Sequence, residues 1–288
     1  MTTQIPTFHL PTGAPIPALG FGTGTAWYKS ESEPLNRVLI DSIKSALALG
    51  YRHLDCAEVY GTEPEVGVAI NESGIPREEL FIVAKSLKTL DDPEKGLNET
   101  LRKLQTDYVD LFLIHAPFLP PTHPLTIPQI WARFETLQKS GKARSIGVSN
   151  FTVPQLTSLL THATIPPSYN QVELNPYCFD APLLRFCQSH NIQLAAYSPL
   201  GPLTKFPGGP LDGVVKRIAE EKGRTESQVL IRWGVEMGVV VVTTSSRAER
   251  QEEFKGVDFE LGEEVMREIT EVGGREHHRI YWTKDYEN

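Results

Sequence analysis

Eight short apolar segments, distributed over nearly the whole chain, constrain the fold of this protein more than any other feature of its sequence. They occupy residues 19–23, 51–56, 81–86, 109–115, 143–149, 169–174, 193–198 and 239–244. From about residue 33, stretches with helical periodicity separate them, and this alternation is typical of repeated β-α units around a parallel sheet. Eight such units predict an α/β fold of the closed (β/α)8 TIM-barrel class, with an open doubly wound sheet as the alternative.

Local signals mark the ends of several predicted helices. The segments 62–65 (TEPE) and 225–228 (TESQ) have the pattern of a capping box, in which the first and fourth side chains each accept a hydrogen bond from the other residue's backbone N–H. Gly50 and Gly74 each follow a helical pattern, and we expect them to end those helices.

The rest of the chain fits one domain. Segment 8–19 (FHLPTGAPIPAL) has turn residues at 11–13 and is predicted to form an N-terminal β-hairpin that closes the barrel floor. No repeat or composition break divides residues 1–288, which we expect to form a single domain. The Pro/Gly-rich segment 201–210 is predicted to be a loop at the active face, and the tail from about residue 273 is expected to cover the barrel.

Composition and charge narrow the function classes. The net charge of −8 and the pI of about 5.6 argue against nucleic acid and anionic membranes as partners. Residues 1–11 lack the features of a signal peptide, and no segment approaches the roughly 20 apolar residues of a membrane helix. We therefore predict a cytoplasmic protein with its three cysteines reduced. We also expect it to be a monomer. Neither an H-E-x-x-H motif nor a carboxylate constellation near His277 and His278 is present, so no metal is predicted.

Four ionisable side chains fall at or just after the ends of predicted strands. Asp55 and His115 come at the ends of the second and fourth strands, and Lys85 lies near the end of the third. Tyr60 follows in the loop after the second strand. Because barrel enzymes build their sites at the carboxyl ends of the strands, we expect these four groups to meet on one rim.

Such a set suits the polarisation and protonation of a carbonyl group. A tyrosine with the ordinary pKa of about 10 is a weak acid at neutral pH, and Lys85 beside Tyr60 would stabilise its phenolate. Asp55 would hold Lys85 in place, while His115 would donate a hydrogen bond to a substrate oxygen. Each residue alone has a structural alternative: a capping aspartate, a packed tyrosine or a core histidine. Lys85 is the sharpest signal, since lysine is almost never buried without a partner.

Four segments resemble the signature sequences of aldo-keto reductases, and the likeness covers nearly the whole chain. They are GYRHLDCAEVYGTEPEVGVAI (50–70), IVAKS (82–86), LFLIHAP (111–117) and GKARSIGVSNF (141–151). The resemblance implies that Asp55, Tyr60, Lys85 and His115 are the catalytic tetrad of that family. It further implies that Tyr60 is the general acid for a carbonyl reduced by hydride from a nicotinamide cofactor.

The same resemblance implies a set of cofactor-binding residues. They are Gly22, Thr23, Asp55, Ser149, Asn150, Gln171, Tyr197, Ser198, Leu200, Thr243, Thr244, Ser245, Ser246, Arg250 and Glu253. Ser149, Asn150 and Gln171 would hold the carboxamide, and Tyr197 would stack beneath the nicotinamide ring. Without the resemblance, strand-end polarity and core packing would explain these residues equally well.

One segment departs from the family pattern. Where the family usually has V-I-P-K-S, residues 241–246 are VVTTSS, so Thr244 takes the place of a lysine that helps to hold the 2′-phosphate of NADPH. Arg250 is present, and a guanidinium can bind phosphate through two hydrogen bonds, with Ser245 and Ser246 adding hydroxyl donors. We therefore expect NADPH as the cofactor, with NADH as a weaker alternative.

The finer likeness is to fungal α-keto amide and conjugated polyketone reductases, which implies small activated ketones such as α-diketones, α-keto amides and keto-lactones as substrates. Trp27, Phe118 and Trp282 are candidate substrate-pocket walls beside Tyr60 and His115, with plain packing as the alternative for these three aromatics.

Other functions are open at this point. A Schiff-base aldolase using Lys85 and a non-catalytic binding subunit with the same fold are the two rivals. Segment 20–24 (GFGTG) lacks the third glycine of a Rossmann loop, and no P-loop motif occurs, so neither of those nucleotide-binding modes follows.

Overall fold

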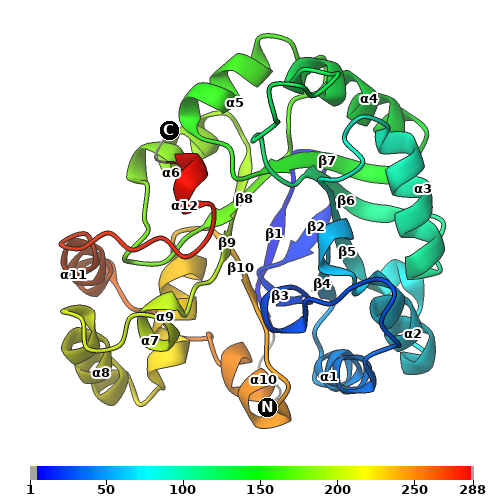
Figure 1. Ribbon diagram of the computed structural model, residues 1–288. Helices are drawn as coiled ribbons and strands as arrows, with labels where there is room; N and C mark the ends of the chain where they lie inside the picture. Colours follow the sequence, from blue (N-terminus) through cyan, green and yellow to red (C-terminus); the bar gives the residue numbers. More distant parts are fainter. Residues whose placement is uncertain (1–4, 287–288) are drawn as a thin grey trace.

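A closed barrel of eight parallel strands forms the centre of the protein (Figure 1). The computed structural model describes residues 5–286. Around the barrel the strand order is β10-β3-β4-β5-β6-β7-β8-β9, and β10 closes the ring by pairing with both β9 and β3. The strands are β3 (Leu19–Gly22), β4 (His53–Asp55), β5 (Phe81–Ser86), β6 (Val109–Ile114), β7 (Ala143–Ser149), β8 (Tyr169–Glu173), β9 (Gln193–Tyr197) and β10 (Val240–Thr243). The predicted barrel is confirmed, and the open sheet is excluded.

Helices surround the barrel and cover the outer faces of its strands (Figure 1). The longer ones are α1 (Arg37–Ala48), α2 (Glu63–Ser73), α3 (Pro93–Leu104), α4 (Ile127–Lys139), α5 (Val153–Leu160), α6 (Ala181–Ser189), α8 (Leu211–Lys222), α9 (Glu226–Glu236), α10 (Ala248–Lys255) and α11 (Glu263–Gly273). Short helical turns are η1 (Thr25–Trp27), η2 (Glu58–Tyr60), η3 (Arg77–Glu79), α7 (Gly201–Thr204) and α12 (Thr283–Tyr286). None of the helices within residues 5–286 is long and apolar enough to cross a membrane.

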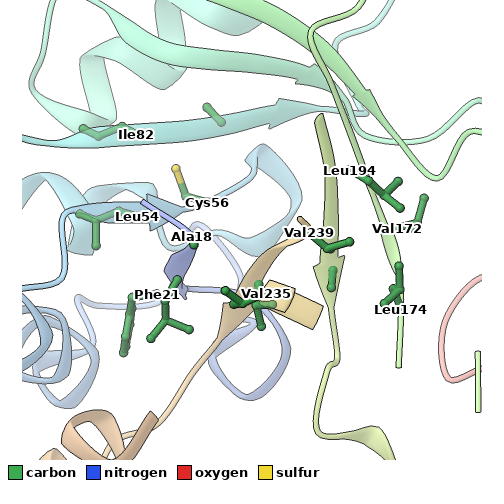
Figure 2. Close-up of a cluster of buried hydrophobic side chains, with 14 of the residues drawn as sticks. Ala18, Phe21, Leu54, Cys56, Ile82, Val172, Leu174, Leu194, Val235 and Val239 are labelled. Carbon is green, nitrogen blue, oxygen red and sulfur yellow. The ribbon is translucent and has the colours of Figure 1, made fainter. Parts of the chain in front are cut away.

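The main hydrophobic core lies between strands and helices. Leu54 and Ile82 belong to this core and are fully buried, and Figure 2 shows them with other core side chains such as Phe21, Val172 and Leu194. Their strand neighbours, such as Asp55 and Lys85, face the inside of the barrel because successive side chains of a strand point to opposite faces. The same period of two that builds the core therefore aims the polar residues inward.

The N-terminal hairpin fills the floor of the barrel, as predicted. Strands β1 (Thr7–His9) and β2 (Pro15–Pro17) pair antiparallel around the expected turn. Ile16 is fully buried in a second apolar cluster inside the barrel, together with Phe81 and Leu111. The Thr12 hydroxyl lies 2.9 Å from the Ser145 hydroxyl and adds a polar contact to this floor. Within residues 5–286 the hairpin therefore closes this end of the barrel, and the opposite end is left for a ligand.

Some predicted helix ends are confirmed, and one is wrong. Gly50 and Gly74 follow α1 and α2 with φ of 97° and 68°, the left-handed geometry that favours glycine. The capping box at 225–228 is formed. At 62–65 it is not: Thr62 donates to the backbone oxygen of Thr23 instead, at 3.1 Å.

Glu65, the other residue of the predicted capping box, also has partners from a distant part of the chain. Glu65 accepts a 2.6 Å hydrogen bond from Lys29 and another from the backbone N–H of Asn36. Both contacts come from the loop between β3 and α1. Tertiary contacts of this loop therefore replace the local cap, and they tie it to α2 beside Tyr60.

Candidate active site

A cavity of about 660 Å³ opens at the carboxyl ends of the barrel strands. Asp55, His115 and Gln171 line its base, and it extends outward to Arg250 on α10 and to Trp282 in the C-terminal tail. The predicted loop at 201–210 begins with the short helix α7, which also borders the cavity. The site thus lies at the end of the barrel where its strand pattern and family resemblance place it.

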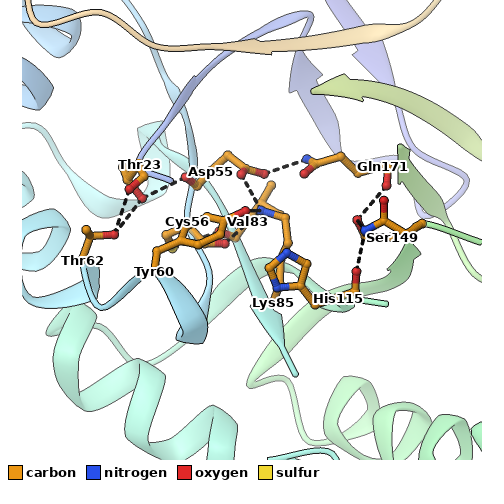
Figure 3. Close-up of polar contacts among 11 residues, drawn as sticks. Thr23, Asp55, Cys56, Tyr60, Thr62, Val83, Lys85, His115, Ser149 and Gln171 are labelled. Carbon is orange, nitrogen blue, oxygen red and sulfur yellow. Dashed lines mark hydrogen bonds and ion pairs between the residues drawn. The ribbon is translucent and has the colours of Figure 1, made fainter. Parts of the chain in front are cut away.

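A buried ion pair lies at the base of the cavity. Lys85 on β5 is fully buried, and its ammonium donates to Asp55 Oδ1 and, at 3.1 Å, to the backbone oxygen of Cys56 (Figure 3). Asp55 Oδ2 accepts a 2.8 Å hydrogen bond from Gln171 Nε2. The predicted pairing of Asp55 with Lys85 is therefore formed, and both carboxylate oxygens have partners.

Tyr60 lies directly above this pair. Its hydroxyl is 3.5 Å from Lys85 Nζ. Burial raises the pKa of Tyr60 well above 10, and the negative charge of Asp55 raises it further. Lys85 lies where it was expected, beside the phenol, but the pKa of Tyr60 shifts upward, with burial as the largest cause. Tyr60 therefore holds its proton firmly at neutral pH.

His115 follows β6 and lies against Tyr60. The two rings meet edge to face with 5.5 Å between their centroids. Burial, followed by the positive charge of Lys85, lowers the pKa of His115 well below 6.5. At neutral pH the imidazole is uncharged and carries a single N–H donor. His115 and Tyr60 thus offer two neutral donors on one side of the cavity.

Two glycines beside Tyr60 lie too close to neighbouring atoms to be replaced by a larger residue. A Cβ on Gly24 would lie 2.8 Å from the Tyr60 ring. Gly61, with φ of 70°, has the Lys29 carbonyl where its Cβ would be, at 2.3 Å. Tyr28 packs edge to face on Tyr60 at 5.0 Å. The loop after β3 therefore packs closely against the phenol.

The residues expected to hold the carboxamide form one hydrogen-bonded group. Asn150 Nδ2 donates to the backbone oxygen of His115 at 2.9 Å and to the Ser149 hydroxyl at 3.1 Å. Tyr197 donates to Asn150 Oδ1 at 2.8 Å, and Ser149 donates to the backbone oxygen of Gln171 at 2.7 Å. Asn150, Gln171 and Tyr197 all line the cavity, so a polar wall with an adjoining aromatic ring borders the base.

The predicted cofactor residues divide into two groups. Those that line the cavity are Gly22, Asp55, Ser149, Asn150, Gln171, Tyr197, Ser198, Leu200, Thr243, Thr244 and Arg250. Those outside its lining are Thr23, Ser245, Ser246 and Glu253. Thr23 is buried beneath the rim, where its hydroxyl donates to the backbone oxygen of Asp55 at 3.1 Å, and Glu253 accepts from Thr225 at 2.7 Å.

Two cationic side chains line the cavity. Arg250 lies over the ring of Phe254 at 5.6 Å and forms no salt bridge with any residue between 5 and 286. Lys205, which the sequence reasoning missed, also lines the cavity and is likewise unpaired within that range. Thr244, in the place of the family lysine, accepts a 2.9 Å hydrogen bond from the indole N–H of Trp27.

Aromatic side chains border the substrate side. Trp282 lines the cavity, with its ring 6.2 Å from His115 and 5.3 Å from Phe118. Trp27 and Phe118 lie outside the lining, so they touch the site through other residues. Tyr28 and Tyr281 line the cavity but were missed. The expectation that the tail from about residue 273 covers the barrel was a sequence signal that pointed towards Tyr281.

The site as a whole fits a nicotinamide dinucleotide. Its polar wall offers amide donors and acceptors next to the Tyr197 ring, and its lining includes two cations without salt bridges in residues 5–286, which suit phosphate groups. Tyr60 and His115 present donors to the same cavity. Such an arrangement can polarise a carbonyl oxygen and protonate it.

Comparison with known proteins agrees with this geometry. The model of the Aldo/keto reductase family matches residues 18–273. The NAD/NADP-dependent indole-3-acetaldehyde reductase of Schizosaccharomyces pombe is 41% identical over 272 residues, covering 93% of this chain and 96% of the relative. The NADPH-dependent alpha-keto amide reductase of Saccharomyces cerevisiae is 40% identical over 296 residues, covering 97% and 95%.

Solved structures give the same result. A Bombyx mori aldo-keto reductase crystallised in complex with NADP has a TM-score of 0.89 and 32% identity to this chain. The match covers 99% of this chain and 97% of the silkworm protein. Fold and sequence therefore agree over almost the full length.

Proposed function

This chain belongs to the aldo/keto reductase family, and we propose that it reduces small activated ketones and aldehydes to alcohols, with NADPH as cofactor and Tyr60 as the proton donor. The observation that carries this proposal is the contact of Tyr60 with both His115 and the buried Asp55–Lys85 pair. NAD(P)H-dependent carbonyl reduction is the activity of the family relatives.

NADPH, when bound, supplies the hydride that reduces the carbonyl carbon and leaves as NADP⁺. Ser149, Asn150 and Gln171 would hold its carboxamide, Tyr197 would support the ring, and Arg250 would bind the 2′-phosphate. Lys205 provides a further cation in the lining of the cavity. Like Arg250, it forms no salt bridge within residues 5–286 and could bind a phosphate of the cofactor.

Tyr60 and His115 would act on the carbonyl oxygen. His115, uncharged because burial lowers its pKa, donates a hydrogen bond to that oxygen. Tyr60 gives its proton as negative charge develops there, since an alkoxide is a far stronger base than a phenolate. Lys85 stabilises the phenolate that remains until solvent returns a proton, and Asp55 holds Lys85 in position. One hydride and one proton thus convert the carbonyl to an alcohol.

The likeness to the yeast alpha-keto amide reductase supports α-keto amides, α-diketones and keto-lactones as substrates. A second candidate class is aryl-substituted aldehydes. The fission yeast indole-3-acetaldehyde reductase and the aromatic walls Tyr28, Tyr281 and Trp282 favour it. The Schiff-base alternative is disfavoured, because Lys85 lies outside the cavity lining with its ammonium held by Asp55 and Cys56. Monomeric state and cytoplasmic location stay predictions.

Replacing Tyr60 with Phe tests the proposal. We expect Tyr60→Phe to lower kcat by at least about a hundredfold, the scale of losing a general acid, while the NADPH dissociation constant stays within about twofold. Cofactor fluorescence titration and stopped-flow reduction of a diketone, an α-keto amide and an arylacetaldehyde measure both quantities and rank the substrates. Tyr108→Phe, which removes a hydroxyl outside the cavity lining, is the control and should keep its activity. Turnover of Tyr60→Phe near the wild-type rate would refute the role of Tyr60.

A further inference from the structure

The C-terminal tail forms one wall of the cavity although it has little regular structure. Ile280, Tyr281 and Trp282 line the cavity, just before the single turn of α12. Trp282 adopts a left-handed backbone conformation, with φ of 58°, which a bulky residue keeps only when its surroundings hold it there. Some contact must therefore fix this stretch of the tail.

Glu173, the last residue of β8, makes that contact. It is 2% exposed, and its carboxylate oxygens accept hydrogen bonds from the backbone N–H of Ile280 at 2.8 and 3.0 Å and of Tyr281 at 2.9 Å. A buried carboxylate that receives two N–H groups forms strong, charge-assisted hydrogen bonds. These two donors belong to residues that line the cavity.

Other tail contacts lie on either side of this anchor. The His278 ring stacks on the Phe206 ring at 4.5 Å between centroids. The backbone N–H of His278 donates to the backbone oxygen of Tyr177 at 3.0 Å. At the other end, the Tyr286 hydroxyl donates to the backbone oxygen of Asn150 at 2.9 Å. Glu173 holds the stretch between them, directly before Trp282.

We propose that Glu173 is a positioning residue, which fixes the tail across the mouth of the site so that Trp282 forms a rigid wall beside His115. The inference rests on the proposed reductase function for its effect on catalysis. Glu173 acts through the tail backbone and touches no reacting atom. Its loss should leave the tetrad in place and weaken the binding of substrates large enough to reach Trp282.

The test compares Glu173→Ala and the milder Glu173→Gln with Glu135→Ala. Glu135 is an equivalent control, because it is also buried and accepts two backbone N–H groups, from Thr164 and Ile165 at 2.7 and 2.9 Å, without lining the cavity. Two readouts apply to each variant. Trypsin cleavage after Arg279, followed by intact mass spectrometry, measures tail release; KM and kcat for a bulky aryl ketone and a small diketone measure its effect on the site.

We expect both Glu173 variants to be cut after Arg279 at least about tenfold faster than wild type, and KM for the aryl ketone to rise about tenfold. The value of kcat and the KM for the diketone should change less than about threefold. A general loss of stability would instead lower kcat without changing KM. This is the largest effect that we expect for Glu135→Ala. Unchanged cleavage, or unchanged KM in Glu173→Gln, would overturn the proposal. Because proteolysis needs no turnover, it reports on the anchor even if the reductase function fails.

Discussion

Removing the buried cation gives the sharpest test of the site. Lys85→Met leaves the buried carboxylate of Asp55 with no counter-charge, and it removes the hydrogen-bond donor to the Cys56 oxygen. Breaking a buried ion pair by removing one partner costs about 3–5 kcal/mol of unfolding free energy. For a domain of this size, each kcal/mol lowers Tm by roughly 2–4 °C. We expect a folded, destabilised and inactive protein.

A double variant separates stability from catalysis. Asp55→Asn combined with Lys85→Met removes both charges of this pair, and the asparagine oxygen can still accept the hydrogen bond from Gln171. The main remaining loss is the donor to the Cys56 oxygen, about 1 kcal/mol. The double variant should therefore unfold within about 2 kcal/mol of wild type, yet reduce ketones at least about a hundredfold more slowly.

Urea unfolding followed by circular dichroism, thermal melting and stopped-flow reduction of a diketone measure these effects. Lys85→Met with wild-type stability would contradict the cost assigned to an unpaired Asp55. Recovery of turnover in the double variant would show that Lys85 matters for folding alone and takes no part in proton transfer.

Two further predictions concern the cofactor and the phenol. Arg250→Ala should raise the NADPH dissociation constant roughly tenfold or more, because a charge-assisted contact contributes about 1.5–3 kcal/mol, and it should change NADH binding little. Thr244→Lys should strengthen the binding of NADPH selectively. NADPH affinity should also fall with salt, and equal weakening of both cofactors in isothermal titration would contradict the phosphate assignment. Gly24→Ala should lower kcat at least about tenfold in steady-state assays, because its Cβ would lie 2.8 Å from the Tyr60 ring. The NADPH dissociation constant should stay similar. An unchanged kcat would mean that the loop shifts without moving the phenol.

The sequence alone determined the barrel and the positions of its polar residues. Strands such as 81–86 and 143–149 were predicted with the bounds the structure has, since short apolar runs between helical patterns are a local signal. Asp55, Lys85 and His115 were predicted to meet because parallel strands end on one side of a barrel. Periodicity and strand direction are properties of the chain itself, and they suffice for this much.

Tertiary structure decided how those residues behave. The pKa of Tyr60 is raised mainly by burial, which depends on all the elements that surround the phenol. Thr62 does not form its predicted cap and instead donates a hydrogen bond to Thr23, 39 positions away. Glu173 binds a tail segment more than 100 residues further along the chain. Such contacts join segments that are distant in sequence, so no local pattern encodes them, and they appear only when the barrel closes.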